Sequence, residues 1–379
     1  MKTKNSNLTA AKAAKNDEFY TRLSDIENEL KYYKDQFKDK VVYCNCDNPS
    51  RSEFVRFFRL KFVDYGIKKL IATCITEDNS NGWAYVWDRD INGNGILDED
   101  EVTMFPLTQN GDFRSEECIE YLKETDIVVT NPPFSQYRSF IETIMKYEKK
   151  FLVIANDNSI TYKEIFPYIK DGKLRSGKNK PKEFVQPDGT IKKFGNISWY
   201  TNLLVHKADN PMELIEKYDP IKYPHYDNYE AINVDKVTDI PYDYDGVMGV
   251  PITIVDKIAD DGYIHFTHTG IDSVSSIRAE ILGHEHDLNE THDSVSQLVV
   301  RGGASTNESS SSLSDSRDIT GRYEVYQQEK SVHENIDSKD IIFKIYGIDR
   351  YVSDNPFYGK RFTINNKEVY ARVLIQKIK

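Results

Sequence analysis

Strand-like and helical segments alternate between residues 40 and 170, and this order limits the folds that the chain can adopt. The runs typical of buried strands are KVVYCN, KKLIATCI, DIVVT and KKFLVIAN. Apolar side chains recur at helical spacing in residues 22–37, 50–66, 115–124 and 135–148. Ser50 is the candidate N-cap of the second of these segments. The alternation predicts an α/β fold, with a mostly parallel sheet that has helices on both faces.

Composition is that of a soluble globular protein. The chain has 379 residues, enough for two domains, with 29% charged and 39% hydrophobic residues. No apolar stretch is long enough to cross a bilayer, and the basic N-terminus lacks the apolar core of a signal peptide, so a cytoplasmic protein is expected. A buried thiol pair at Cys44 and Cys46 is favoured over a metal site, and no metal is predicted.

Polar turns follow the predicted strands. Asp47 comes after the first strand, Glu77 after the second, and Asp112 just before the helix at 115–124. The tetrapeptide NPPF at 131–134 follows DIVVT. Ligands bind outside the carboxyl ends of the strands in open α/β sheets, so these turns together predict a binding site. Each one alone would be an ordinary turn, because Asp, Asn and Pro favour turns.

The NPPF tetrapeptide has the most specific chemistry. A proline pair ends a strand, because each ring removes an N–H and fixes φ near about −65°. The Asn131 side-chain oxygen and the Pro132 carbonyl can hold both N–H bonds of an exocyclic amino group. Pro133 keeps the turn rigid, and Phe134 offers a flat face for stacking on a base. This arrangement suits methylation of an amine by positioning, without a general base. Related NPPY turns serve enzymes that methylate glutamine side chains or RNA guanines.

Several ordered stretches resemble one enzyme family. They are NDEFYTRLSDIENELKYY, DKVVYCNCDNPSRSEF, GDFRSEECIEYLKETDIVVTNPPFS, KKFLVIANDNSITYKEIF, ISWYTNL, YPHYDNYEAINVDKVTDIPYDYDGVMGVPIT and NNKEVYARVLI. They cover most of residues 16–255 and a segment near the end of the chain, and they are similar to the EcoRI-type DNA adenine-N6 methyltransferase family. The resemblance implies a class I methyltransferase (Rossmann-like) fold and S-adenosyl-L-methionine as methyl donor. It also implies transfer to N6 of a flipped adenine at a specific site in double-stranded DNA.

The resemblance further implies a restriction-modification setting, in which a cognate restriction nuclease would be a partner. Two alternatives stay open. One is an RNA or protein amide methyltransferase that uses the same NPPF turn. The other is a DNA-binding module that has lost catalysis, against which the intact turn argues. The recognised DNA sequence cannot be deduced from the chain.

The resemblance assigns nine residues to the methyl donor. They are Phe19, Tyr20, Thr21, Cys46, Asp47, Pro49, Glu77, Asp112 and Phe113. The first three match a motif that lines the methionine end of the donor. Glu77 matches the acidic residue that binds the ribose hydroxyls, and Asp112 with Phe113 matches the pair that reads the adenine ring. The turn CNCDNPS lacks the glycine-rich loop of methyltransferases at large, a departure that the EcoRI type shares.

One segment is basic although the chain as a whole is acidic. The net charge of −11 argues mildly against a nucleic-acid partner. Residues 170–193, however, hold eight basic and three acidic residues, with Gly, Pro and Ser that forbid a long regular element. Lys178, Lys180 and Lys182 are the candidates for phosphate contacts in DNA. From charge alone, a solvated surface loop is the alternative.

Two stretches lie outside the resemblance. Residues 90–101, DINGNGILDEDE, fit an EF-hand calcium loop, but their flanks read as strands, so a polar hairpin tip is favoured. Residues 284–338 include a Ser-rich run and predict a flexible insertion. The predicted domains are a donor-binding catalytic domain at 1–208, which includes the basic loop 170–193, and a less regular DNA-recognition region at 209–379.

Overall fold

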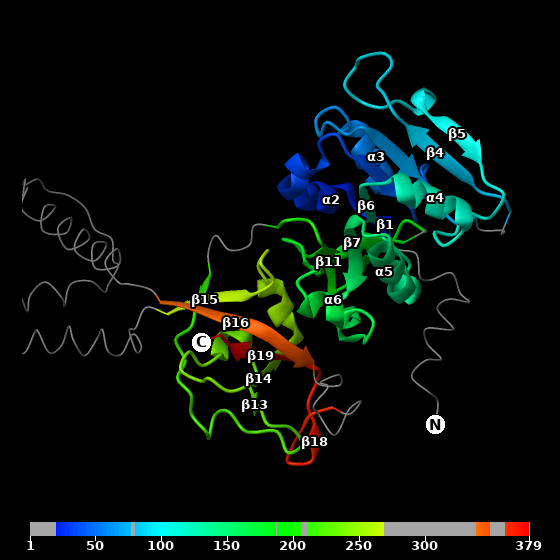
Figure 1. The fold of residues 1–379 in the computed structure, drawn as a ribbon. Coiled ribbons are helices and arrows are strands. Elements are labelled where there is room, and N and C mark those ends of the chain that lie inside the picture. Colours follow the sequence, from blue (N-terminus) through cyan, green and yellow to red (C-terminus); the bar gives the residue numbers. More distant parts are fainter. Residues whose placement is uncertain are drawn as a thin grey trace, which may run out of the picture.

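An eight-stranded sheet forms the centre of the computed structural model (Figure 1). The structure describes residues 20–76, 80–186, 188–205, 211–268, 339–348 and 361–378. Across the sheet the strands are, in order, β5 (Thr103–Pro106), β4 (Trp83–Trp87), β3 (Lys69–Ala72), β2 (Val41–Cys44), β6 (Ile127–Thr130), β7 (Lys150–Asn156), β11 (Ile197–Thr201) and β8 (Arg175–Ser176). The four runs predicted as buried strands are the neighbours β3, β2, β6 and β7.

The sheet is mixed, whereas the sequence predicted a mostly parallel one. Its four central strands are parallel. On both flanks the strands β4, β5, β11 and β8 run antiparallel to their neighbours. Residues 73–82 join β3 to β4, and this link is shorter than the roughly dozen residues that a parallel crossover needs. The chain therefore turns back at this edge, and the parallel prediction holds for the centre alone.

Helices cover both faces of this sheet, as predicted. One face carries α2 (Leu23–Leu30), η1 (Lys31–Phe37) and α3 (Glu53–Leu60). The other carries α4 (Glu116–Glu124), α5 (Tyr137–Lys146) and α6 (Phe166–Lys170). Side chains of β2 point alternately into the two cores, because a strand has a period of two.

Helix α3 starts two residues later than predicted. Ser52, and not Ser50, is its N-cap, because Ser52 Oγ accepts hydrogen bonds from the backbone N–H groups of Phe54 (3.1 Å) and Val55 (3.4 Å). The hydroxyl of Ser50 instead donates to Asn48 Oδ1 at 2.7 Å. Both serines are of the residue type that N-cap positions favour. Ser50 bonds to Asn48 in the preceding turn, so Ser52 is the one that caps the helix.

A second sheet of six strands lies beyond the first along the chain (Figure 1). Its order is β12 (Met212–Glu213), β15 (Ile264–His268), β16 (Lys339–Ile348), β19 (Arg372–Lys377), β14 (Met248–Pro251) and β13 (Ile232–Asn233). One continuous core joins Phe166 of α6 to Phe343 of β16. The described part of this region thus forms a sheet that shares a core with α6. The predicted domain boundary at 208 and the insertion at 284–338 lie outside the described residues.

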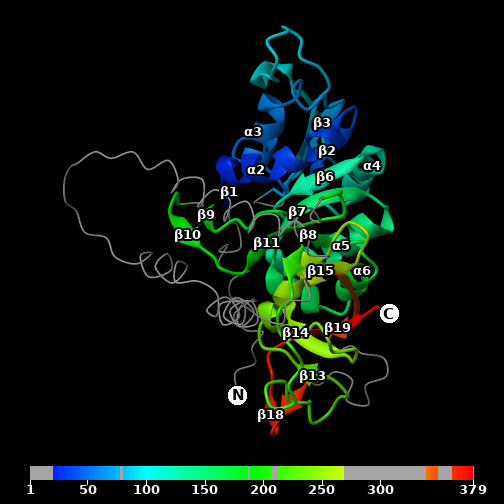
Figure 2. The ribbon, with the colours of Figure 1, turned by 90° about the vertical axis from the view of Figure 1, so that its left-hand side faces the viewer.

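Short strands interrupt the predicted basic loop at 170–193. In it β9 (Glu183–Val185) and β10 (Ile191–Lys193) form a hairpin, and β9 also pairs with β1 (Tyr20–Thr21) (Figure 2). The remaining short elements are β17 (Thr363–Ile364), β18 (Lys367–Glu368), η2 (Glu99–Glu101), η3 (Phe134–Gln136), η4 (Asp157–Thr161), η5 (Val237–Asp239) and η6 (Ile252–Lys257). In the part of the chain that the structure describes, no helix is long and apolar enough to span a membrane.

Candidate active site

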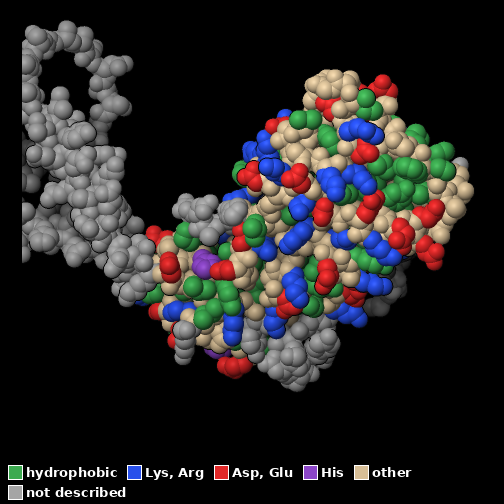
Figure 3. Space-filling model, turned by 45° about the horizontal axis from the view of Figure 1, so that its top comes forward, with side chains coloured by type: hydrophobic (Ala, Val, Ile, Leu, Met, Phe, Trp, Pro, Cys, Tyr) green, Lys and Arg blue, Asp and Glu red, His purple; other side chains and the backbone are tan. Residues whose placement is uncertain are grey.

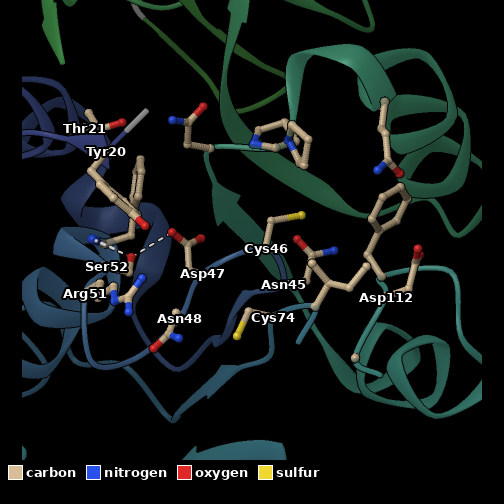
Figure 4. A pocket seen from close by; sticks show the side chains of 18 of the residues that line it. Tyr20, Thr21, Asn45, Cys46, Asp47, Asn48, Arg51, Ser52, Cys74 and Asp112 are labelled. Atoms are coloured by element: carbon tan, nitrogen blue, oxygen red, sulfur yellow. Dashed lines mark hydrogen bonds between the residues drawn. The ribbon is translucent and has the colours of Figure 1, made fainter. Parts of the chain in front are cut away.

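The turns after β2, β3 and β6 meet around one pocket at the carboxyl edge of the sheet (Figure 4). The pocket encloses about 1050 Å³, part of it open to solvent, which is ample for a small-molecule ligand. Its walls come from residues 20–21, 45–48, 51–54, 74–75, 111–113, 131–134 and 136. The structure therefore brings together turns that lie far apart in the sequence.

Asp47 links the turn after β2 to the end of β6. Ser52 Oγ donates to Asp47 Oδ1 at 2.7 Å (Figure 4), and Thr130 Oγ1 donates to Asp47 Oδ2. The backbone N–H of Asp47 donates to the Thr73 carbonyl at 3.1 Å. Burial raises the pKa of Asp47 to about 6, against the lowering effect of the two hydroxyl donors. The carboxyl group thus joins the start of α3 to the end of β6, and the backbone N–H of the same residue joins this turn to the end of β3.

The NPPF turn lies directly after β6 and borders the same pocket. Asn131, Pro132, Pro133 and Phe134 all line it. The Phe134 ring packs partly against the core under α3, and the 3₁₀ turn η3 begins at this residue. The N–H of Gln136 donates to the Pro133 carbonyl at 2.8 Å. A backbone hydrogen bond thus closes the chain just after the two prolines, at the wall of the pocket.

Asp112 and Phe113 reach the pocket because Gly111 permits a close approach. Gly111 has a φ of +80°, and a Cβ there would lie 2.2 Å from the Cys74 carbonyl oxygen. Hydrogen bonds from Arg114, at 2.8 and 2.5 Å, hold the pKa of Asp112 below its ordinary value. Phe113 is mostly buried, and its ring lies 5.3 Å from that of Phe140.

Of the other residues predicted to bind the donor, some line the pocket and others do not. Tyr20, Thr21 and Cys46 line the pocket, whereas Pro49 does not. Phe19 and Glu77 lie outside the described residues. Figure 4 shows Tyr20 and Thr21 on the same side of the pocket as Ser52.

Sequence reasoning missed several lining residues. They are Asn45, Asn48, Arg51, Ser52, Glu53, Phe54, Cys74, Ile75, Gly111 and Gln136. The buried oxygens Thr21 Oγ1, Asn45 Oδ1 and Gln136 Oε1 in the lining have no hydrogen-bond partner in the described part of the protein. A buried polar atom without a partner is costly, so these atoms indicate where a polar ligand would bind. Gly111, the glycine of GDFRS, was the sequence feature from which the close approach to Cys74 could have been predicted.

The three candidate DNA-contacting lysines lie elsewhere. Lys178 and Lys180 line a second hollow, while the Lys182 side chain is exposed and lines neither cavity. Lys180 Nζ forms ion pairs with Asp256 (2.7 Å) and Asp157 (3.7 Å). Burial lowers the pKa of Lys180, but the two carboxylates raise it on balance. Basic and acidic side chains are interspersed over the face seen in Figure 3.

Residues 90–101 form a polar loop between β4 and β5. The Asp90 carboxylate accepts hydrogen bonds from the N–H groups of Gly93 (2.7 Å) and Gly95 (2.7 Å), and the Glu101 carboxylate from Ile91 (2.7 Å). In the described residues no cluster of three or more His, Cys, Asp or Glu side chains is arranged to hold a metal ion. Calcium titration followed by calorimetry separates a hairpin tip, which gives no binding heat, from a calcium loop.

The four cysteines are free thiols. Cys44 and Cys118 are buried, as expected for structural thiols, whereas Cys46 and Cys74 are half-buried and line the pocket. The predicted buried pair at Cys44 and Cys46 is therefore right for Cys44 alone. Strand β2 ends at Cys44, so Cys46 belongs to the turn at the sheet edge.

Known proteins similar to this chain are methyltransferases. Type II methyltransferase M.EcoRI of Escherichia coli is 45% identical over 279 residues, which cover 66% of this chain and 85% of the relative. Type II methyltransferases M.MgeORF184P of Mycoplasma genitalium and M.MpnI of Mycoplasma pneumoniae are each 38% identical, over 65% of this chain and 80% of their own. No solved structure gives a significant match. The model of the family described as adenine-specific methyltransferase EcoRI matches residues 7–378, so the chain belongs to this family of adenine-specific DNA methyltransferases.

Proposed function

We propose that the protein transfers a methyl group from S-adenosyl-L-methionine to N6 of a flipped adenine at a specific site in double-stranded DNA. The observation that carries the proposal is the pocket lined by several turns at the carboxyl edge of the sheet. It is bordered by the NPPF turn after β6 and by the turns after β2 and β3. A ligand in the pocket and a base at the turn would thus be neighbours. The parallel centre of the sheet agrees with a Rossmann-like, class I methyltransferase fold.

The composition of the pocket fits the methyl donor. The buried oxygens Thr21 Oγ1 and Asn45 Oδ1 need hydrogen-bond partners, and the donor carries ammonium and hydroxyl groups that can supply them. The lining holds the acidic residues Asp47, Glu53 and Asp112 against the guanidinium of Arg51, and this excess of acidic groups favours a cationic ligand. When bound, the donor supplies an activated methyl group. We assign its methionine end to Phe19, Tyr20 and Thr21.

The remaining donor contacts follow the order of the turns. Glu77 would bind the ribose hydroxyls, and Asp112 with Phe113 would hold the adenine ring of the donor. Cys46, Asp47 and Pro49 would belong to the loop that packs against the donor. Pro49 does not line the pocket, so its part would be to shape this loop.

The NPPF turn would bind the target base. The amino group of adenine is a poor nucleophile, because its lone pair is delocalised into the ring. Asn131 Oδ1 and the Pro132 carbonyl would accept hydrogen bonds from its two N–H groups. These hydrogen bonds would favour a pyramidal nitrogen, and the lone pair of this nitrogen would point at the methyl group. The Phe134 ring would stack on the base. These residues act by position and electrostatics, so no side chain needs to remove a proton before the transfer.

DNA would be held by both parts of the chain. We assign the donor-binding and catalytic role to residues 1–208 and sequence recognition to residues 209–379. Phosphate contacts would come from the basic segment 170–193, through Lys178, Lys180 and Lys182. A cognate restriction nuclease would be the functional partner in a restriction-modification system, in which methylation protects the host DNA.

Transfer of tritium from labelled donor to DNA, RNA and protein tests the proposal. We expect label in duplex DNA alone, with a loss of about a hundredfold or more in turnover for Asn131→Ala. Donor binding and the urea unfolding midpoint should stay unchanged in this variant. Label in RNA or protein would favour an amide or RNA methyltransferase instead, and failure to bind the donor would indicate a module without catalysis.

A further inference from the structure

A second hollow lies beside the proposed active site and has no role in donor or base binding. It is formed by residues 176–180, by Ser198 at the start of β11, and by Pro211, Met212, Asp256, Lys257, Ala259 and His265. It encloses about 820 Å³, part of it open to solvent. The hollow therefore lies where the two large sheets of the protein meet.

The register of the first sheet places this hollow close to the NPPF turn. Ser198 of β11 pairs with Ala155 of β7, and Thr130, the last residue of β6, pairs with Val153 of β7. Ser198 is thus level with the residues just after Thr130 and two strands away from them. At a strand spacing of about 4.8 Å, this separation is roughly 10 Å. The hollow lies at the same edge of the sheet as the target base would.

A buried carboxylate fixes the shape of the hollow. Glu29 of α2 is fully buried and accepts hydrogen bonds from the backbone N–H groups of Lys178 (2.8 Å) and Asn179 (2.8 Å). It also accepts from Asn179 Nδ2 (3.0 Å) and the Tyr33 hydroxyl (2.8 Å). A Cβ at Gly177 would lie 2.2 Å from Glu29 Oε1. Residues 176–180 are therefore held rigidly around this anchor.

The lining of the hollow suits an anion. Lys178, Lys180 and Lys257 line the hollow, together with Asp256, whose carboxylate pairs with Lys180 Nζ at 2.7 Å. The Ser198 side chain is 1% exposed, and its hydroxyl has no hydrogen-bond partner in the described part of the protein. A buried hydroxyl gains a full hydrogen bond when an acceptor enters, and phosphate oxygens are strong acceptors for hydroxyl and ammonium donors.

We propose that this hollow holds one phosphodiester group of the DNA strand, within a few nucleotides of the methylated adenine. The assignment rests on the proposed function. Lys257 would neutralise the phosphate, and Ser198 Oγ would donate a hydrogen bond to it, while Lys180 stays in its ion pairs with Asp256 and Asp157. Such a contact fixes the register of the duplex against the active site without reading sequence. It would also explain how a chain with a net charge of −11 holds DNA at this edge.

Salt-dependent binding of duplex DNA tests the charge. Binding is measured by fluorescence anisotropy from low to moderate salt, with a duplex that carries the sequence methylated by the wild-type enzyme. Each phosphate contact contributes about 0.9 to the slope of log affinity against log salt. We expect Lys257→Gln to lower the slope by about 0.9. The control Lys123→Gln removes an exposed charge on α4, close to the start of β6 at the opposite edge of the sheet, and should leave the slope unchanged.

Ser198→Ala tests the hydroxyl without a change of charge. We expect DNA affinity to fall several-fold at an unchanged salt slope, while the urea unfolding midpoint stays the same or rises, because an unpartnered buried hydroxyl is removed. A duplex with one neutral methylphosphonate linkage then identifies the phosphate. The wild-type protein should lose affinity at one linkage near the adenine, and Lys257→Gln should lose no more at that linkage.

The outcomes separate the two proposals. If the wild-type protein methylates DNA while Lys257→Gln and Ser198→Ala bind with its affinity and salt slope, the phosphate assignment is wrong and the proposed function stands. If the wild-type protein neither binds nor methylates duplex DNA, the proposed function is wrong and the phosphate assignment is lost with it.

Discussion

Replacement of Asp47 by asparagine tests how a buried carboxyl group makes the stability of this protein depend on pH. Asp47 is 7% exposed, and it accepts hydrogen bonds from Ser52 and Thr130. Burial raises its pKa from 3.8 to about 6. Because the pKa is higher in the folded state, the folded protein binds more protons than the unfolded chain between pH of about 4 and about 6. Stability contributed by this group is present below pH 4 and is lost as the pH rises to 6.

The size of the effect follows from this shift. A rise from 3.8 to about 6 corresponds to about 3 kcal/mol, at about 1.4 kcal/mol for each pH unit. Ionisation of Asp47 should therefore lower the wild-type free energy of unfolding by about 3 kcal/mol as the pH rises from 4 to 7. An asparagine cannot ionise. The difference in unfolding free energy between Asp47→Asn and the wild type should thus move by about 3 kcal/mol in favour of the variant over this range.

Urea unfolding, followed by tryptophan fluorescence at several pH values between 4 and 7, measures this difference. Asp88→Asn is the matched control, because the Asp88 side chain is 61% exposed. Its difference from the wild type should change little over the same range. Parallel stability profiles for Asp47→Asn and the wild type would refute the view that Asp47 is a buried group whose ionisation is opposed by the fold.

Three further substitutions test other parts of the structure. Gly111→Ala should destabilise the protein by about 1–3 kcal/mol in urea unfolding, because the φ of Gly111 is +80° and a Cβ there would meet the Cys74 carbonyl. The same variant should bind the donor more weakly in calorimetry. An unchanged unfolding midpoint would contradict the close contact with Cys74. Glu29→Ala should cost about 3 kcal/mol or more, because it leaves buried donors without an acceptor, whereas the exposed Glu27→Ala should be nearly neutral; equal midpoints would show that Glu29 is no anchor. Phe134→Ala should lower the single-turnover rate of methyl transfer more than tenfold under conditions in which the variant stays folded, since its ring also packs against the core under α3; an unchanged rate would exclude stacking.

The centre of the fold could be predicted from the sequence because of how parallel strands are buried. β2, β3, β6 and β7 are covered on both faces, so they appear as continuous apolar runs. The flanking strands escaped the prediction. WAYVW in β4 has an exposed first residue and half-buried ones, and β8 and β12 have two residues each, too few for a periodic pattern.

The site was predictable where its chemistry follows directly after a strand. Asp47 and the NPPF turn occupy such positions, and the structure places both at the pocket. Contacts between distant segments leave no local pattern. The approach of Gly111 to Cys74, and the ion pair between Lys180 and Asp256, depend on how separate loops pack. The sequence therefore indicated Lys180 as a free cation for DNA, while the fold already pairs it with a carboxylate.

The central claim is that the protein methylates adenine in DNA and that its NPPF turn holds the target base. Sequencing that detects N6-methyladenine, applied to DNA from a host that expresses either the wild-type protein or Asn131→Ala, tests it most directly. We predict methylated adenine at one recurrent sequence with the wild type and none above background with the variant at equal protein levels. Equal methylation in both hosts, or none with the wild type, would contradict the account.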